Sequence, residues 1–214
     1  MSDLVVQTIP NGRYVENCYL LGDPDAGTAV LIDPGEEPER ALAALRHRGW
    51  TLTSIWLTHG HVDHVLGVGA VRAATHAPIR LHPRDRFLYD HAPLDADDPG
   101  VAIEMPAVDV GWEDGEVVTV GRHPFTVRWV PGHSPGHVCF IGADCVFSGD
   151  VLFSGTIGRT DLPGADHRTL VDSIQRVLLS LPDRTTVFPG HGRPTTIGVE
   201  RETNPFLGAV RHGG

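Results

Sequence analysis

The run THGHVDH, residues 58–64, constrains this chain more than any other stretch. It places three histidines and an aspartate within seven residues, directly after the apolar segment SIWL. A single histidine is usually an ordinary surface or core residue. Four titratable groups at the end of an apolar strand form either a polar surface patch or part of a metal site, and the rest of the chain must distinguish the two.

Side chains of the same kind follow three other predicted strands. FTVRWV (125–130) leads to His133, CVFSG (145–149) leads to Asp150, and TVF (186–188) leads to His191. Two of these turns share the letters PGH. Because sites in α/β proteins are built outside the carboxyl ends of the strands, we expect these residues to meet those of the first run.

The spacing inside THGHVDH suits two neighbouring metal positions. His59 and His61 are two residues apart, so in an extended segment they point the same way. Asp63 and His64 begin the helix that follows and face another direction. Imidazole suits zinc, iron and similar ions, and a carboxylate can bridge two of them. The pattern therefore predicts a metal centre.

We expect the other histidines to be surface or core residues. His137, in GHSPGH, is the nearest to an exception, with a supporting role beside the ligands as its alternative. The remainder are His47, His76, His82, His91, His123, His167 and His212.

Composition argues against several classes of function. The net charge is −10, from 27 acidic and 17 basic residues, which argues against nucleic-acid binding. All the basic residues are arginine, so lysine chemistry is excluded. Cys18, Cys139 and Cys145 form no CxxC pair and suggest reduced thiols in a cytoplasmic protein. We see no signal peptide and no apolar run near the roughly 18 residues of a membrane span.

The order of elements favours a layered α/β domain. A long segment, 90–116, holds nine acidic residues and no arginine, and we expect it to be an irregular loop. We predict helices at 36–50, 65–76 and 165–181. The predicted strands cover 4–9, 17–21, 29–33, 54–58, 78–82, 116–120, 125–130, 137–142, 145–153 and 186–188.

Taken together, THGHVDH, PGHSPGH, SGD and PGH resemble the metallo-β-lactamase fold superfamily over nearly the whole chain. The stretches GDVLFSGTIGRTDLPGAD and LPDRTTVFPGHGRPTTIGVERETNPFL are similar to the short glyoxalase II-like (hydroxyacylglutathione hydrolase) group. The resemblance implies a four-layer αβ/βα sandwich made by one domain over residues 1–214. The C-terminal helical domain of longer glyoxalase II enzymes would be absent.

The resemblance also implies a ligand set for two divalent metal ions. Zinc is the expected metal, with iron and manganese as alternatives. One ion would take His59, His61 and His133, the other Asp63, His64 and His191, and Asp150 would bridge them. Asp63 would in addition orient the attacking water.

The expected reaction is hydrolysis of a thioester such as S-D-lactoylglutathione, or of a thioester of a similar thiol. Arg159 aligns with the glutathione-binding lysine of the longer enzymes, and Arg193 stands where those enzymes have a tyrosine. Both are candidates for binding the carboxylates of the thiol carrier. For Arg159 the alternative is a structural salt bridge with Asp161 or Asp166.

Two other activities fit the same ligands. Persulfide dioxygenases of this superfamily keep all seven ligand positions but hold one iron, and they also carry a GRTD stretch. A lactonase or β-lactamase activity is the other alternative. The sequence predicts no nucleic-acid or membrane partner and no particular oligomeric state.

Overall fold

The computed structural model describes residues 3–95 and 105–207. Its described strands form two mixed sheets and a small hairpin. The first sheet has the order β1-β2-β3-β4-β5 and the second the order β13-β12-β9-β8-β7-β6. The strands of the first sheet are β1 (Val5–Asn11), β2 (Glu16–Asp23), β3 (Thr28–Ile32), β4 (Thr51–Trp56) and β5 (Ile79–Arg80). Those of the second are β6 (Val117–Val120), β7 (His123–Trp129), β8 (Val138–Ile141), β9 (Cys145–Gly149), β12 (Thr186–Pro189) and β13 (Thr195–Thr196). The hairpin pairs β10 (Leu152–Phe153) with β11 (Thr156–Ile157).

The central strands are buried on both faces, and their alternate residues belong to different cores. On β2, Cys18 and Leu20 pack in one cluster, whereas Tyr19 and Leu21 pack in another. This follows from the period of two that a strand imposes on its side chains. The second cluster joins the two sheets and contains aromatic residues of both, such as Trp56 of β4 and Phe147 of β9.

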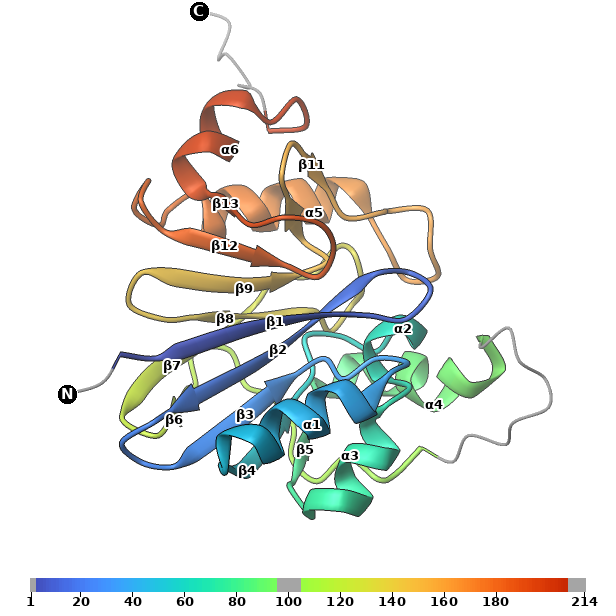
Figure 1. The fold of residues 1–214 in the computed structure, drawn as a ribbon. Helices are drawn as coiled ribbons and strands as arrows, with labels where there is room; N and C mark the ends of the chain where they lie inside the picture. Colours follow the sequence, from blue (N-terminus) through green and yellow to red (C-terminus); the bar gives the residue numbers. More distant parts are fainter. Residues whose placement is uncertain (1–2, 96–104, 208–214) are drawn as a thin grey trace, which may run out of the picture.

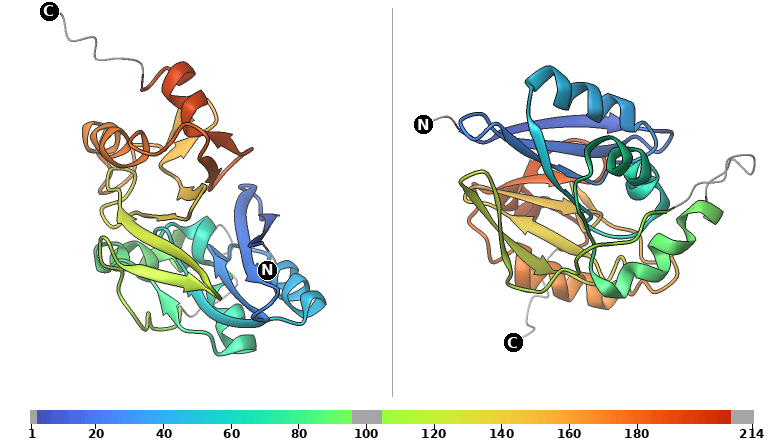
Figure 2. Two further views of the ribbon diagram at one scale, coloured as in Figure 1. Left: turned by 90° about the vertical axis from the view of Figure 1, so that its left-hand side faces the viewer. Right: turned by 90° about the horizontal axis from the view of Figure 1, so that it is seen from below.

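Helices cover the outer faces. Figure 1 shows α1 (Pro38–Arg48) and α3 (Val68–Thr75) beside the first sheet and α5 (His167–Ser173) and α6 (Ile197–Thr203) beside the second. Leu45 of α1 and Val71 of α3 pack on the first sheet, and Leu170 of α5 packs on the second. Figure 2 shows the same order of helix, sheet, sheet and helix from two further sides. The predicted four-layer α/β sandwich is confirmed.

Four predicted elements differ in the structure. The strand expected at 145–153 is β9 followed by β10 of the hairpin, and the two are separated at Asp150 and Val151. The helix expected at 65–76 is two helices, α2 (Val62–Val65) and α3, because the Gly67 N–H donates to the carbonyl of Pro34 at 3.0 Å instead of to the preceding helical turn. The approach is so close that a Cβ on Gly67 would lie 2.2 Å from the oxygen of Gly35. The helix expected at 165–181 is α5 followed by a π-helical turn at Ile174–Leu178. The strand expected at 78–82 is only β5.

The loop expected at 90–116 is wrong at its start. Residues up to Asp95 belong to α4 (Arg86–Asp95), which follows a 3₁₀ turn, η1, at Pro83–Asp85. Residues 96–104 lie outside the described residues. From Met105 to Gly115 the chain has no helix or regular strand, although Val110 forms an isolated bridge with Arg80.

In the described part of the chain, none of the helices combines the length and apolarity that a membrane crossing requires. The extent of the domain, residues 1–214, stays a prediction.

Candidate metal centre

The seven predicted ligands gather at one edge of the two sheets. β12 runs parallel to β9. β7 runs in the same direction as β9, because β7 and β9 are both antiparallel to β8. Their carboxyl ends therefore lie at a common edge, where they deliver His133, Asp150 and His191. The end of β4 in the facing sheet delivers the other four ligands.

Six of the seven residues lie in two groups, whose members are those that the family resemblance implies for the two ions. Ligand-type atoms of His59, His61 and His133 lie within 4.8 Å of one another. The same limit holds for Asp63, His64 and His191.

Asp150 lies between these groups. Its Oδ1 is 3.4 Å from His64 Nε2, and its Oδ2 is 3.7 Å from His133 Nε2 and 3.5 Å from His191 Nε2. One carboxylate therefore faces one histidine of the first group and two of the second.

The residues present fit metal ions. Within the described chain, Nε2 of His59, His61 and His64 and Oδ1 of Asp150 are buried and make no hydrogen bond. Buried polar atoms are normally paired, since an unpaired one costs about 1–3 kcal/mol. His64 Nε2 lies 3.4 Å from Asp150 Oδ1, and His61 turns its Nδ1 to within 2.9 Å of His133 Nε2, so a cation at the centre would meet ligand-type atoms of all four residues. The His and Asp clusters are consistent with a binuclear centre.

Backbone carbonyls orient two of the ligands. His133 donates from Nδ1 to the carbonyl of Arg159 at 2.9 Å, and His191 donates from Nδ1 to the carbonyl of Tyr14 at 3.1 Å. Each bond leaves the lone pair of Nε2 directed at the centre. Such bonds fix the tautomer and the ring orientation of a metal ligand.

Asp33 orients two more ligands and was not predicted from the sequence. It accepts hydrogen bonds from Thr58 N at 2.8 Å and Thr58 Oγ1 at 2.7 Å, and it lies 3.1 Å from His64 Nδ1. Because the Thr58 hydroxyl gives its proton to Asp33, its oxygen accepts from His59 Nδ1 at 2.9 Å. Asp33 has a positive φ of 50° at the end of β3. No local motif marks it.

Asp85 and His137 support the loops that carry the ligands. Asp85 is buried and accepts from Gly60 N, Ser134 Oγ and Gly136 N, which joins η1 to both ligand loops. His137 accepts from Asp150 N at 3.1 Å and stacks on His59, which confirms the alternative considered for His137. Asp85 was also missed, because a lone aspartate gives no sequence signal.

Burial and neighbouring charges shift the pKa values of the ligand side chains. Burial, together with His133, lowers the pKa of His61 to about 3, and burial also lowers the pKa of His59 and His133. Such histidines are neutral at pH 7, which is the form that binds metal. Burial would raise the pKa of Asp63, but His64 and His191 hold it below its usual value.

A pocket of about 550 Å³ opens above the ligands. Five of the seven predicted ligands line it, His61, Asp63, His133, Asp150 and His191. Arg159 lines it too, yet its guanidinium forms a two-contact salt bridge with Asp161, the alternative considered for it. Arg193 is not among the lining residues and donates to Ser154 Oγ at 3.3 Å. Substrate binding by either arginine stays a prediction.

The sequence model of the Metallo-beta-lactamase superfamily matches residues 11–191. The chain belongs to this superfamily. It is 38% identical over 213 residues to the hydroxyacylglutathione hydrolase GloC of Haemophilus influenzae, covering 94% of this chain and 97% of that protein. The crystal structure of the BLEG-1 B3 metallo-beta-lactamase superposes with a TM-score of 0.88 at 39% identity, covering 96% of this chain and all of that one.

A further solved relative was described with metal in place. The structure of TTHA1623 in a di-iron-bound form has a TM-score of 0.85 and 47% identity, and the match covers 94% of this chain and all of that one. Together with the His and Asp clusters, the superfamily match identifies the chain as a metallo-hydrolase.

Proposed function

We propose that the chain is a binuclear metallohydrolase that cleaves a thioester, such as S-D-lactoylglutathione, to a hydroxy acid and a free thiol. The observation that carries the proposal is the convergence of seven ligand-type side chains, four of which have a buried and unpaired nitrogen or oxygen, beneath a pocket that five of them line. The similarity to GloC, which is named a hydroxyacylglutathione hydrolase, supports the thioester class.

His59, His61 and His133 would hold one ion, Asp63, His64 and His191 the other, and Asp150 would bridge them. We propose zinc, with iron as the alternative that the di-iron form of TTHA1623 supports. Ions held this way lower the pKa of a bound water from about 15.7 to about 7 and polarise a carbonyl oxygen.

The chain's own residues position the reactants. Asp63 lines the pocket and its Oδ2 lies 3.1 Å from His191 Nε2. Because its pKa is low, Asp63 is a carboxylate at pH 7 and can accept a hydrogen bond from the attacking water. A thiolate is a good leaving group, so the reaction needs no strong general acid. Arg159 and Arg193 are proposed to bind carboxylates of the thiol carrier at the rim.

The test is to follow loss of the S-D-lactoylglutathione thioester with purified protein whose metal content is measured on the same sample. Turnover with about two metals per chain supports the proposal. Asp63→Asn is expected to lower kcat by 100-fold or more. Full activity of that variant with intact metal content would contradict the role of Asp63. One iron per chain, with oxygen uptake on glutathione persulfide and no hydrolysis, would favour a dioxygenase.

β-Lactam hydrolysis is the second candidate, because BLEG-1 is named a metallo-beta-lactamase and matches the chain at nearly full length. Turnover of a β-lactam by the same metal-loaded sample, at a kcat/KM above that for any thioester, would favour it.

We also propose a cytosolic location. All three cysteines are free in the structure, in keeping with a reducing compartment.

A further inference from the structure

The walls of the pocket above the metal ligands are mainly apolar. Phe153 on β10 and Ile157 on β11 line the pocket. Leu162 and Pro163, in the loop that follows β11, and Leu88 of α4 line it as well. Apolar side chains from separate elements thus surround one opening.

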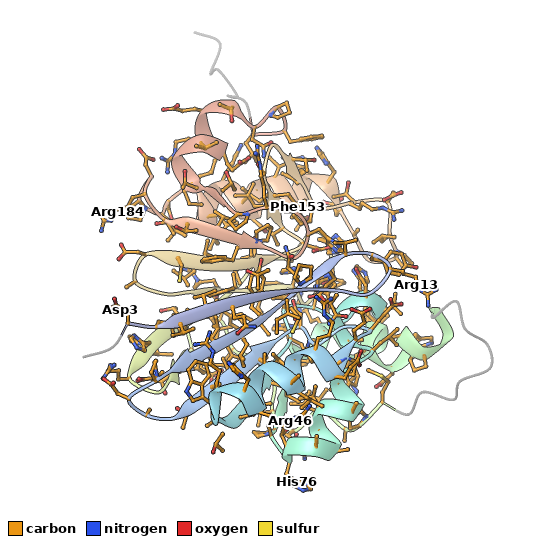
Figure 3. The ribbon with its side chains drawn as sticks, in the orientation of Figure 1. Asp3, Arg13, Arg46, His76, Phe153 and Arg184 are labelled. Atoms are coloured by element: carbon orange, nitrogen blue, oxygen red, sulfur yellow. The ribbon has the colours of Figure 1, made fainter. Side chains whose placement is uncertain are left out.

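The apolar surface begins at the ligands themselves. The ring of Phe153, labelled in Figure 3, packs edge-on against the ring of His191, with centroids 6.2 Å apart and planes at 77°. Val62 lies in the pocket wall directly between the ligands His61 and Asp63 in sequence. A group attached to the reacting carbon would therefore contact carbon atoms as soon as it leaves the metal centre.

Polar recognition in the described lining is sparse. Apart from the ligands, the polar lining residues are Tyr14, Thr156 and Arg159. The guanidinium of Arg159 contacts Asp161 at 3.0 and 3.1 Å, and the two side chains are 69% and 70% exposed. This cation is largely exposed to solvent, where it is available to a thiol carrier at the rim.

We infer that the pocket favours a thioester whose acyl part is apolar, an aliphatic chain of several carbons or an aromatic acid, over the small hydroxyacyl group of S-D-lactoylglutathione, and that Phe153, Ile157 and Leu88 make this selection. This inference rests on the proposed thioesterase function. In the reaction, the oxygen of water bonds to the acyl carbon and the carbon–sulfur bond breaks. The products are the carboxylate, the free thiol and one proton.

The test compares S-acetyl-, S-butyryl- and S-hexanoylglutathione, which share one carrier, on the metal-loaded protein. Burying one methylene is worth about a fourfold gain in kcat/KM, so the value should rise about fourfold for each added methylene until the pocket is filled. A value that is constant or falls along the series would overturn the inference.

Variants test the wall directly. Phe153→Ala should lower kcat/KM for the hexanoyl substrate about tenfold while that for the acetyl substrate changes less than about twofold. Phe153→Leu, which keeps an apolar wall, should recover most of the loss. Phe206→Ala removes a 48% exposed phenylalanine that does not line the pocket and is the matched control. Equal losses for both substrates in Phe153→Ala would contradict selection by this side chain.

Binding separates failure of this inference from failure of the proposed function. Calorimetry of the metal-loaded protein with S-hexylglutathione and S-methylglutathione needs no turnover. If no thioester is hydrolysed but the hexyl compound binds at least tenfold more tightly, the proposed reaction is wrong and the apolar pocket stands. If both bind equally, the inference is wrong whatever the enzyme hydrolyses.

Discussion

Substituting Gly190 by alanine should destroy the metal centre while leaving the fold intact. Gly190 precedes the ligand His191, and a Cβ there would lie 2.1 Å from Asp150 Oδ1 and 2.8 Å from His64 Cε1. Carbon atoms of real side chains keep at least 3.0 Å from such neighbours, so the Asp150 carboxylate would have to move by about 0.9 Å. The backbone of Gly190 is not among the positive-φ residues, so alanine adopts it without strain.

The expected size follows from this displacement. Functional groups must be held within about 0.5 Å of their working geometry, and Asp150 is the ligand shared by both ions. We expect the variant to lose metal affinity by at least 100-fold. Overpacking costs about 1–3 kcal/mol, and replacing glycine by alanine returns about 0.4–1 kcal/mol through the unfolded chain. The metal-free protein should therefore be destabilised by no more than about 2.6 kcal/mol.

The assay has two parts. Zinc affinity is measured by competition with a chelator, and the free energy of unfolding of the metal-free protein is measured by urea denaturation. Gly111→Ala is the matched control, because its Cβ would meet only Pro83, at 3.1 and 3.4 Å. If Gly190→Ala binds two metals with the affinity of the parent, Asp150 does not bridge them as we infer.

Two further predictions concern residues behind the ligands. His137→Ala leaves the buried Asp150 N–H without its acceptor. We expect the free energy of unfolding to fall by about 1–3 kcal/mol and the zinc affinity to fall by about 10–100-fold. Unchanged values in the same two assays would refute this prediction. Burial raises the pKa of Asp85 from 3.8 to about 6, so the folded protein favours the protonated carboxyl. The resulting contribution to the free energy of unfolding is fully present below pH 3.8 and is lost as the pH rises through 6. The total loss is about 3 kcal/mol. Asp85→Asn cannot titrate, so the difference in unfolding free energy between the metal-free parent and this variant should shift in favour of the variant across that window. A difference that does not change between pH 4 and pH 7 would contradict the raised pKa.

Much of the metal centre could be predicted because its ligands obey local rules. His59 and His61 share a direction through the period of a strand, and Asp63 and His64 diverge from them because a helix begins between the pairs. His133, Asp150 and His191 each follow an apolar strand whose carboxyl end must lie at the same edge. The strands were recognisable as short apolar, β-rich runs that turn signals separate.

Only the tertiary structure decided what holds these ligands in place. Asp33 meets Thr58 across 25 positions, and Asp85 meets Gly136 across 51, so no short motif contains either pair. The break at Gly67 depends on the backbone of Pro34 and Gly35 lying against it, which helix propensity does not report. Likewise the sequence offered Asp161 and Asp166 as partners of Arg159, but only the folded chain selects Asp161 and places apolar side chains beside the ligands.

The difference between what the sequence predicts and what only the fold decides has a physical cause. Metal ligands are specified by residue type and by the geometry of one strand end, and a few consecutive residues determine both. Hydrogen bonds to those ligands and the walls of the pocket join segments that packing alone brings together, and their partners are fixed by the global minimum of the fold rather than by neighbours in the chain.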